Sequence, residues 1–214
     1  MFLSQEERQQ INAVVARFEA KTGVQAIAAF TAQADAYPEV PWKAFAMGSA
    51  LGALAVSLDP LYVSSWTGAG ALGIDALIVL GAGSALAMMA AFVPAIGRLF
   101  VDRLRAQTEA IQYARTVFLE REVFRTASRC AVLLVMCRFE RIAVVLADTG
   151  LAQHATPAAL NDIGRAAGAL LRRDQAVAAC ELALGRVSAL LEGREHAGPS
   201  RVNELADDAV VERR

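Results

Sequence analysis

The pattern of hydrophobic and polar positions divides the chain into two polar flanks around an almost uncharged middle. Residues 4–21 predict an amphipathic helix, because apolar side chains recur at the i, i+3, i+4, i+7 spacing of one helical face. These apolar positions are Ile11, Val14, Val15 and Phe18. Ser4 and Glu7 have the spacing of a capping box at the start of this helix, and Gly23 predicts its end.

A short apolar run follows the helix. Residues 24–31 have the length of a strand and lie between Gly23 and a polar stretch at 33–35, which favours a strand over a helix. Pro38 and Pro41 then interrupt any regular element, so residues 36–41 predict a linker.

The middle of the chain carries almost no charge. Between Ala44 and Gly97 there is no Lys, Arg, Glu or His, and Asp59 and Asp75 are the only charged residues. Residues 76–97 form an uncharged run of 22 residues. A helix of that length can cross the hydrocarbon core of a bilayer with some tilt.

The first part of this middle is shorter. Ala44–Leu58 contains 15 uncharged residues, which span only ~22 Å as a helix, whereas a crossing of ~30 Å takes roughly 20 residues. We therefore expect the first crossing to occupy residues 42–64, with a turn at 67–73. The alternative is a buried hairpin in a soluble protein. Such a hairpin predicts a polar face on each helix, and neither run has one.

The second flank returns to mixed polarity. Residues 98–124 predict a charged helix whose apolar stripe is Leu99, Leu104, Ile111 and Phe118. Two apolar runs of strand length, at 129–137 and 141–147, predict an antiparallel hairpin. Thr156 followed by Pro157 predicts the start of a helix, and a second helix is expected at 174–191.

One predicted strand precedes the uncharged middle and two follow it, which indicates a single α/β domain with an insertion. A lone two-stranded hairpin is marginal in water, whereas three strands with helices against one face can be stable. We therefore divide the chain into residues 1–41 and 98–193 as the two parts of the α/β domain, 42–97 as a transmembrane helical hairpin and 194–214 as a polar, loosely ordered tail.

A shared sheet requires both flanks to lie on the same side of the membrane, so the number of crossings must be even. Lys21 and Lys43 precede the first crossing, and a basic cluster follows the second, whereas the connecting loop has no basic residue. This cluster is Arg98, Arg103 and Arg105. The positive-inside rule then predicts a multi-pass protein of a bacterial-type inner (plasma) membrane with both termini in the cytoplasm.

Composition supports this picture and excludes some classes of function. Hydrophobic residues make up 56% of the chain, compared with roughly 45–50% in soluble domains. A net charge of −1 gives no electrostatic basis for a nucleic-acid partner. Three cysteines at scattered positions imply no disulfide framework, and the amino terminus lacks the basic-then-apolar order of a signal peptide.

Small residues are the first candidate functional feature. Gly48 and Gly52 form a small-xxx-small step that lets two helices approach closely, and Gly81 and Ala85 repeat this spacing in the second run. These residues predict packing between the two crossings or between two chains. The glycines at 68, 70 and 73 match the G-x-G-x-x-G pattern, but no βαβ unit surrounds them, so we interpret them as turn residues.

Ionisable residues indicate little catalytic chemistry. Asp59 and Asp75 could serve a proton relay, but both lie at the ends of apolar runs, which favours loop positions. His154 and His196 have no neighbours at metal-ligand spacing, so no catalytic residue and no metal ligand is assigned.

The best candidate for a ligand or cation contact is the sequence Asp148, Thr149 and Gly150, which follows a predicted strand. The alternative is a simple turn in which Gly150 supplies a permissive backbone.

The order of segments resembles the bacterial membrane-inserted branch of the TPM-domain family. The resemblance is carried by the opening helix at 3–8, the turn at 21–23, the linker at 37–40, the hairpin from Ala131 to Gly150 and the segment 203–205. It implies an α-β-α sandwich and a role in assembly, repair or modulation of membrane proteins. Some relatives are described as acid phosphatases or cation binders. The strand-end turn of the family corresponds to Asp148 and Gly150 here.

Three functional hypotheses follow. The first is a non-enzymatic interaction, assembly or quality-control module, whose partners are the lipid bilayer and other membrane proteins, with homo-oligomer formation left open. The second is a metal-dependent acid phosphatase that uses a divalent cation at Asp148. The third is a small transporter or channel subunit that uses Asp59 and Asp75.

Overall fold

The chain forms two compact units, one split in sequence and one continuous. The computed structural model describes residues 3–58, 69–126, 128–192 and 210–212. Residues 1–35 and 104–214 make up the first unit, here called the α/β unit, and residues 36–103 make up the second, here called the hairpin unit. The insertion of one unit into the other agrees with the expected interruption of the α/β domain.

A four-stranded mixed sheet forms the centre of the α/β unit, in the order β3-β2-β1-β4. β1 pairs in parallel with both β2 and β4, whereas β2 and β3 form an antiparallel hairpin. The bounds are β1 Gln25–Thr31, β2 Ala131–Cys137, β3 Ile142–Ala147 and β4 Val210–Glu212. The pairing of β1 with β2 confirms that segments from both sides of the insertion share one sheet.

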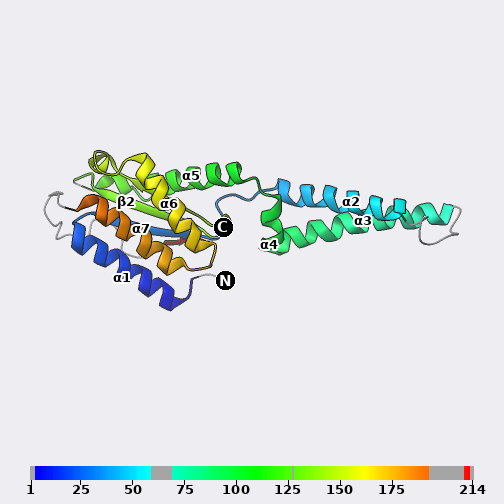
Figure 1. Ribbon diagram of the computed structural model, residues 1–214, viewed down its shortest axis with the longest axis horizontal. Coiled ribbons are helices and arrows are strands. Elements are labelled where there is room, and N and C mark those ends of the chain that lie inside the picture. The colour runs from blue at the N-terminus through cyan, green and yellow to red at the C-terminus, as the bar shows by residue number, and fades with distance from the viewer. Residues whose placement is uncertain (1–2, 59–68, 127, 193–209, 213–214) are drawn as a thin grey trace. The chain divides into compact units, whose positions relative to one another are not determined.

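Helices cover both faces of this sheet (Figure 1). Side chains alternate along β1, so Ala28 and Phe30 lie in the cluster formed with one group of helices, and Ile27 and Ala29 lie in the opposite cluster. The first group comprises α1 Gln5–Thr22, α6 Pro157–Leu171 and α7 Ala176–Leu191; the opposite face is covered by α5 Arg103–Glu120 and the 3₁₀ turn η3 Val123–Arg125. The α/β unit is therefore a mixed α/β fold in three layers.

The predicted helix ends are confirmed where the sequence carries capping residues. The Ser4 hydroxyl accepts a hydrogen bond from the Glu7 backbone N–H at 3.0 Å, and the Glu7 carboxylate accepts one from the Ser4 N–H at 2.7 Å. Gly23 ends α1 with a left-handed φ of 69°. The Thr156 hydroxyl caps α6, with Pro157 at its first position.

The apolar stripe expected for residues 98–124 is wrong in its first half, whereas Ile111 and Phe118 of its second half pack, partly buried, against a core cluster. The segment is broken into the short helix α4 Pro94–Gly97, the 3₁₀ turn η2 Arg98–Phe100 and α5. Leu99 and Leu104 are 80% and 75% exposed. The buried stripe of α5 consists of Ala106, Ala110, Tyr113, Ala114 and Val117.

The prediction of a loosely ordered tail over 194–214 is wrong in one part. Residues Val210–Glu212 form β4, which extends the sheet beside β1 in the register Ala29 with Val210. Three residues are too few for a hydrophobic alternation to be recognised in sequence. The segment 203–205 lies outside the described residues.

The hairpin unit consists of two long antiparallel helices, α2 Glu39–Leu58 and α3 Ala69–Phe92, followed by α4 and η2. Within the described residues, one segment, Leu72–Phe92, is long and apolar enough to cross a membrane by length and composition. α2, which includes Glu39 and Lys43, does not meet that test.

The helices that correspond to the two predicted crossings have different limits from those expected. Pro94 cannot continue α3, so this helix ends at Phe92 instead of Gly97. α3 begins at Ala69, so most of the turn expected at 67–73 is helical, and Asp75 lies inside the helix instead of in a loop. Asp59 and residues 59–64 of the first predicted crossing lie outside the described residues.

Candidate functional site

The two helices of the hairpin unit approach each other through glycines. A Cβ atom on Gly48 would lie 2.6 Å from the Ala82 carbonyl oxygen and 2.9 Å from the Gly83 Cα. A Cβ atom on Gly52 would lie 3.0 Å from the Val79 Cα. The backbones of α2 and α3 therefore touch directly at both predicted positions, as small-xxx-small packing requires.

The second predicted pair lies elsewhere. A Cβ atom on Gly81 would meet nothing within 4 Å, and Ala85 is exposed. Gly83 occupies the contact instead, because it faces Phe45 and Ser49 of α2. Glycine spacing alone does not identify which side of a helix faces its neighbour.

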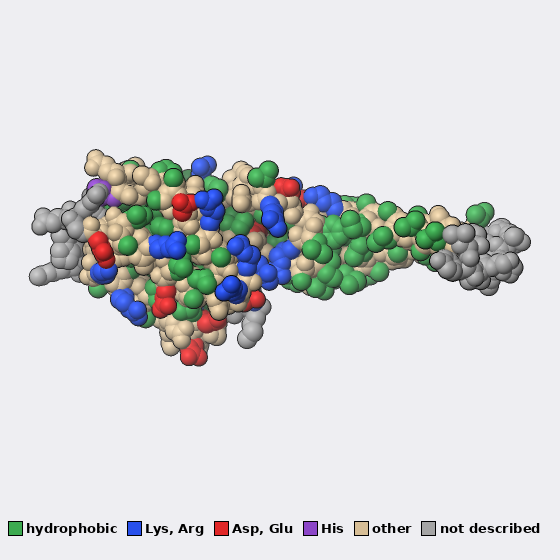
Figure 2. All heavy atoms as spheres, viewed as in Figure 1, with side chains coloured by type: hydrophobic (Ala, Val, Ile, Leu, Met, Phe, Trp, Pro, Cys, Tyr) green, Lys and Arg blue, Asp and Glu red, His purple; other side chains and the backbone are tan. Residues whose placement is uncertain are grey.

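Large apolar side chains point away from the helix pair. The exposed fraction reaches 71% for Leu77 and 81% for Phe92, and Figure 2 shows hydrophobic side chains over most of the visible face of the hairpin unit. The same outward orientation is shared by Leu51, Leu54, Leu72, Ile78, Leu80, Met88 and Met89. Small residues inside and large apolar residues outside are the reverse of packing in a water-soluble helix pair.

Lys43 marks the polar end of this unit. Its ammonium donates a hydrogen bond to the Phe100 carbonyl oxygen at 3.3 Å. This contact connects the start of α2 to the 3₁₀ turn that follows α3. Trp42 beside it is 75% exposed.

The predicted ligand contact at Asp148 is a tightly built turn in the α/β unit. Asp148 is 4% exposed and caps the 3₁₀ turn η4 Thr149–Leu151. Its Oδ1 accepts hydrogen bonds from the Thr149 N–H at 2.7 Å and from the Thr149 hydroxyl at 3.4 Å. Arg129 lies 3.9 Å from the same oxygen.

Gly150 is required by close packing. A Cβ atom there would lie 2.6 Å from the Arg129 carbonyl oxygen and 2.9 Å from both the Cys130 Sγ and the Ser128 carbonyl oxygen. The Gly150 N–H donates to the Arg129 carbonyl at 3.0 Å, and Arg129 itself has a left-handed φ of 53°. The turn after β3 is thereby fixed against the segment that enters β2.

Two buried oxygens in this region make no hydrogen bond among the described residues: the Oδ2 of Asp148 and the Oγ1 of Thr126. Buried polar atoms without partners are uncommon in folded proteins. These oxygens can therefore accept a hydrogen bond from a ligand or from a water molecule. A ligand contact at Asp148, Thr149 and Gly150, as expected from the sequence, thus remains a prediction.

The possible metal ligands around Asp148 do not fit a divalent cation. Ca²⁺ and Mg²⁺ take six or more oxygen ligands, normally with several carboxylates. Asp148 supplies one carboxylate here, and the Arg129 guanidinium already lies beside it. In the part of the chain that the structure describes, no group of three His, Cys, Asp or Glu side chains could hold a metal ion.

The thiols have unequal access to solvent. Cys130 is half-buried, whereas Cys137 and Cys180 are buried. Burial, assisted by the charge of Glu181, raises the pKa of Cys180 to about 12. Burial and the nearby Glu140 raise the pKa of Cys137 far above its ordinary value. Neither buried thiol is a nucleophile at neutral pH.

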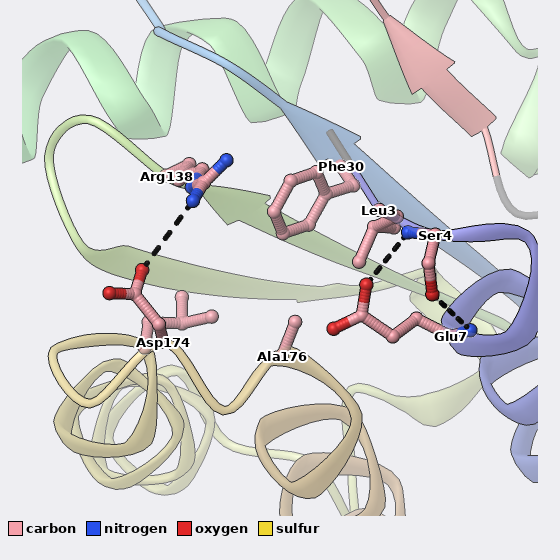
Figure 3. A pocket seen from close by; sticks show the side chains of 8 residues that line it. Leu3, Ser4, Glu7, Phe30, Arg138, Asp174 and Ala176 are labelled. Carbon is pink, nitrogen blue, oxygen red and sulfur yellow. Dashed lines mark hydrogen bonds and ion pairs between the residues drawn. The ribbon is translucent and has the colours of Figure 1, made fainter. Parts of the chain in front are cut away.

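Sequence reasoning missed a pocket at the carboxyl ends of β1 and β2, the usual ligand position in parallel sheets. It has a volume of about 370 Å³ and is lined by Phe30, by Arg138 and by the first turn of α1 (Figure 3). Its polar groups are already paired. Arg138 lies 3.9 Å from Asp174, and Glu7 holds the Ser4 N–H.

Comparisons with known proteins bear on the fold alone. No family model matches the chain, and no curated protein matches it. Among solved structures, the chain is similar to the NMR structure of the BA42 protein from the psychrophilic bacterium Bizionia argentinensis. The two share 10% sequence identity with a TM-score of 0.55, and the match covers 99% of this chain and 97% of that one.

Proposed function

We propose that this protein is a membrane-anchored α/β domain that binds other membrane proteins and is not an enzyme. The observation that carries this proposal is the inverted packing of the hairpin unit. Glycines fill the contact between α2 and α3, while Leu77, Phe92 and their apolar neighbours face outward. Exposed apolar surface of this extent promotes aggregation in water, whereas the hydrocarbon core of a bilayer solvates it favourably.

Chain topology supports two crossings instead of one. β1 precedes the hairpin unit and β2 follows it, yet the two strands pair in one sheet. If α3 crosses a bilayer alone, the strands on either side of it end up in different compartments and cannot pair. α2 has 20 residues, or ~30 Å of helix, which is sufficient to return the chain.

The charge distribution supports a cytoplasmic location for the α/β unit. Lys43 lies in the first turns of α2, and Arg98 and Arg103 follow α3. Basic residues at these ends favour retention on the cytoplasmic side of a bacterial-type inner membrane. The protein is then multi-pass with both termini inside.

The TPM-domain assignment belongs to this proposal. It is supported by the mixed sheet with helices on both faces and by the Asp148 turn at the end of the β-hairpin. The role of assembly, repair or modulation of membrane proteins follows from that resemblance. The absence of a catalytic cluster from the described residues is compatible with such a role.

Extraction and crosslinking of the full chain test the anchor and the partner separately. The chain should stay with the membrane fraction after an alkaline carbonate wash and require detergent for release. Mild crosslinking in native membranes should then yield a discrete adduct with another membrane protein. A matched variant, Leu77→Lys with Leu80→Lys on the outer face of α3, should lose membrane retention, whereas Gln9→Lys with Gln10→Lys on α1 should not.

Two results would contradict the proposal. A monomeric chain that is freely soluble without detergent would refute the membrane anchor. A chain that is retained in the membrane but forms no adduct under any crosslinking condition would refute the interaction role.

The phosphatase hypothesis has its own measurement. The unpartnered Oδ2 of Asp148 is the one observation that favours it, and Arg129 beside that carboxylate opposes a cation. Hydrolysis of p-nitrophenyl phosphate with Mg²⁺, lost in Asp148→Asn, would establish it in place of the non-enzymatic role.

A further inference from the structure

A groove in the α/β unit lies outside the Asp148 turn and the end-of-strand pocket. It has a volume of about 640 Å³ and lies between α5, β3 and α6. α5 contributes Gln107 and Ile111, β3 contributes Ile142 and Val144, and α6 contributes residues along most of its length. All of these elements belong to the same unit.

The floor of the groove is apolar. Ile111 on α5 and Ile142 on β3 are only partly buried, and both pack against the hydrophobic cluster that contains Val144. Leu160 of α6 lines the groove from the other side. A ligand with apolar groups can therefore bury them against this floor.

Strand addition is not the means of recognition here. Asp148 donates its N–H to Ala131, so the ladder alternation turns the N–H and C=O of Ala143 toward the free edge of β3. α6 covers that edge, because a Cβ atom on Gly164 would lie 2.6 Å from the Ala143 carbonyl oxygen. Recognition must come from side chains.

The charged side chains of the groove are mainly basic. Arg141, Arg165 and Arg172 line it, and Asp162 is the one acidic residue among the lining residues. Arg165 forms an ion pair with Asp162. Arg141 and Arg172 form no ion pair among the described residues, and the Nε of Arg141 is buried without a hydrogen-bond partner.

The spacing of the cations defines the length of the ligand. Arg165 and Arg172 are seven residues apart on α6, which separates them by ~10 Å along the helix axis. An extended peptide advances by about 3.3 Å per residue and its side chains alternate between two faces, so two carboxylates four residues apart share a face, lie ~13 Å apart and come within reach of both long arginine side chains.

We infer that this groove binds an extended, acidic segment of a partner protein, with apolar side chains on the floor and carboxylates on Arg141, Arg165 and Arg172. This inference deepens the proposed interaction role and rests on it. Guanidinium groups suit carboxylates because they donate two parallel hydrogen bonds. The apolar floor favours a peptide over a nucleic-acid backbone, which presents charge without apolar groups between its phosphates.

Fluorescence anisotropy with the full chain in detergent micelles tests the inference. The probe is a fluorescein-labelled peptide, Ala-Glu-Leu-Val-Leu-Glu-Ala, which places both Glu side chains on one face when extended, compared with the same peptide carrying Gln in place of Glu. The acidic peptide should bind, and Arg141→Gln with Arg172→Gln should weaken binding at least ~10-fold. The matched control is Arg17→Gln with Arg115→Gln, two exposed arginines outside the groove with the same change of charge.

A charge exchange keeps the test decisive if the neutral variant folds poorly. Arg141→Glu with Arg172→Glu should lose the acidic peptide and gain a peptide in which Lys replaces Glu. Equal weakening in the groove variant and the control pair would overturn the inference, as would equal binding of the Gln peptide. Complete displacement by millimolar inorganic phosphate would assign the groove to a small anion instead.

The peptide assay and the membrane test fail independently. If the chain is soluble without detergent but the acidic peptide binds through Arg141 and Arg172, the result supports the peptide-binding groove and refutes the membrane anchor. If the chain stays in the membrane but no peptide binds, the groove assignment falls alone.

Discussion

Two glycines of the α/β unit lie where a methyl group would meet backbone atoms. A Cβ atom on Gly164 would lie 2.6 Å from the Ala143 carbonyl oxygen, and one on Gly150 would lie 2.6 Å from the Arg129 carbonyl oxygen. Backbone atoms cannot move aside as a flexible side chain can. These positions therefore hold α6 against β3 and the η4 turn against the segment before β2.

Gly164→Ala should destabilise the α/β unit, even though alanine favours a helix. The clash with Ala143 should cost ~1–3 kcal/mol, as for overpacked sites. The matched control is Gly185→Ala on α7, where a Cβ atom would meet nothing within 4 Å. That variant should gain ~0.5–1 kcal/mol. Urea unfolding followed by circular dichroism measures both, and equal effects would contradict the close packing of α6 on β3.

Thiol chemistry should distinguish one cysteine from the other two. At neutral pH the native chain should react rapidly with maleimide at Cys130, which is half-buried, and slowly at the buried Cys137 and Cys180. Mass spectrometry of the labelled chain counts the adducts. Unfolding in urea should make all three thiols react rapidly. Rapid modification of Cys180 in the folded protein would contradict its burial.

The buried thiol of Cys180 also predicts a dependence of stability on pH. Burial raises the pKa of Cys180 to about 12 in the folded chain, whereas an unfolded thiol titrates near ~8.5. The folded-state pKa is the higher one, so the contribution of this thiol is complete below pH ~8.5 and is lost as pH rises toward about 12.

Between pH ~9 and ~10 this thiol should remove ~1.4 kcal/mol of unfolding free energy per pH unit. The Cys180→Ala variant has no thiol at this position and does not lose this free energy. The difference in unfolding free energy between the native chain and the variant should therefore shrink by ~1.4 kcal/mol from pH ~9 to pH ~10. Urea titrations at both pH values measure it. A difference independent of pH would show that Cys180 ionises normally in the folded state.

At the scale of elements, local chemistry determined which predictions held. The limits of α1 could be predicted from local signals. Ser4 and Glu7 cap the start of the helix with their side chains, and Gly23 ends it because glycine readily adopts the left-handed conformation. The antiparallel pairing of β2 with β3 also followed from two adjacent apolar runs. By contrast, β4 has three residues, and its pairing with β1 depends on long-range contacts.

The buried face of α5 was missed because it is lined by small residues. Hydrophobic scales direct attention to Leu99 and Leu104, but both are exposed, and the core cluster on this face of the sheet contains Ala110 and Ala114 instead. Small side chains such as alanine carry little hydrophobic signal in a sequence, even where they are buried. The same ambiguity led to Gly81 instead of Gly83 in the hairpin, and the groove beside β3 has no sequence signature at all.

The contact between α2 and α3 should be sensitive to one methyl group. A Cβ atom on Gly48 would lie 2.6 Å from the Ala82 carbonyl oxygen, so Gly48→Ala should force the helices apart at a cost of ~1–3 kcal/mol. Gly81→Ala introduces the same methyl group into open space and should be neutral or slightly stabilising. Melting temperatures in detergent compare the two variants, and an equal response would place Gly48 outside the helix contact.

At the scale of the whole molecule, the two units have opposite requirements. The α/β unit buries its large apolar side chains between sheet and helices, whereas the hairpin unit exposes them and buries glycine and alanine. Under the proposed function, any crossing of a bilayer by the second unit must be followed by a return, because β1 and β2 on either side of it pair in one sheet. A hairpin that crosses the bilayer twice satisfies both requirements.

Labelling of single cysteines in membrane vesicles tests this arrangement most directly. Cys130→Ser leaves only the two buried thiols as background. Gln9→Cys on α1, Glu120→Cys on α5 and Leu77→Cys on α3 are then treated with a membrane-impermeant maleimide in vesicles of both orientations. Gln9 and Glu120 precede and follow the hairpin unit in the chain, and both are exposed.

If the hairpin unit crosses the bilayer twice, Gln9→Cys and Glu120→Cys should react in the same orientation of vesicle, and Leu77→Cys should react in neither until detergent is added. Reaction of Gln9→Cys and Glu120→Cys in opposite orientations, or free reaction of Leu77→Cys without detergent, would contradict this topology.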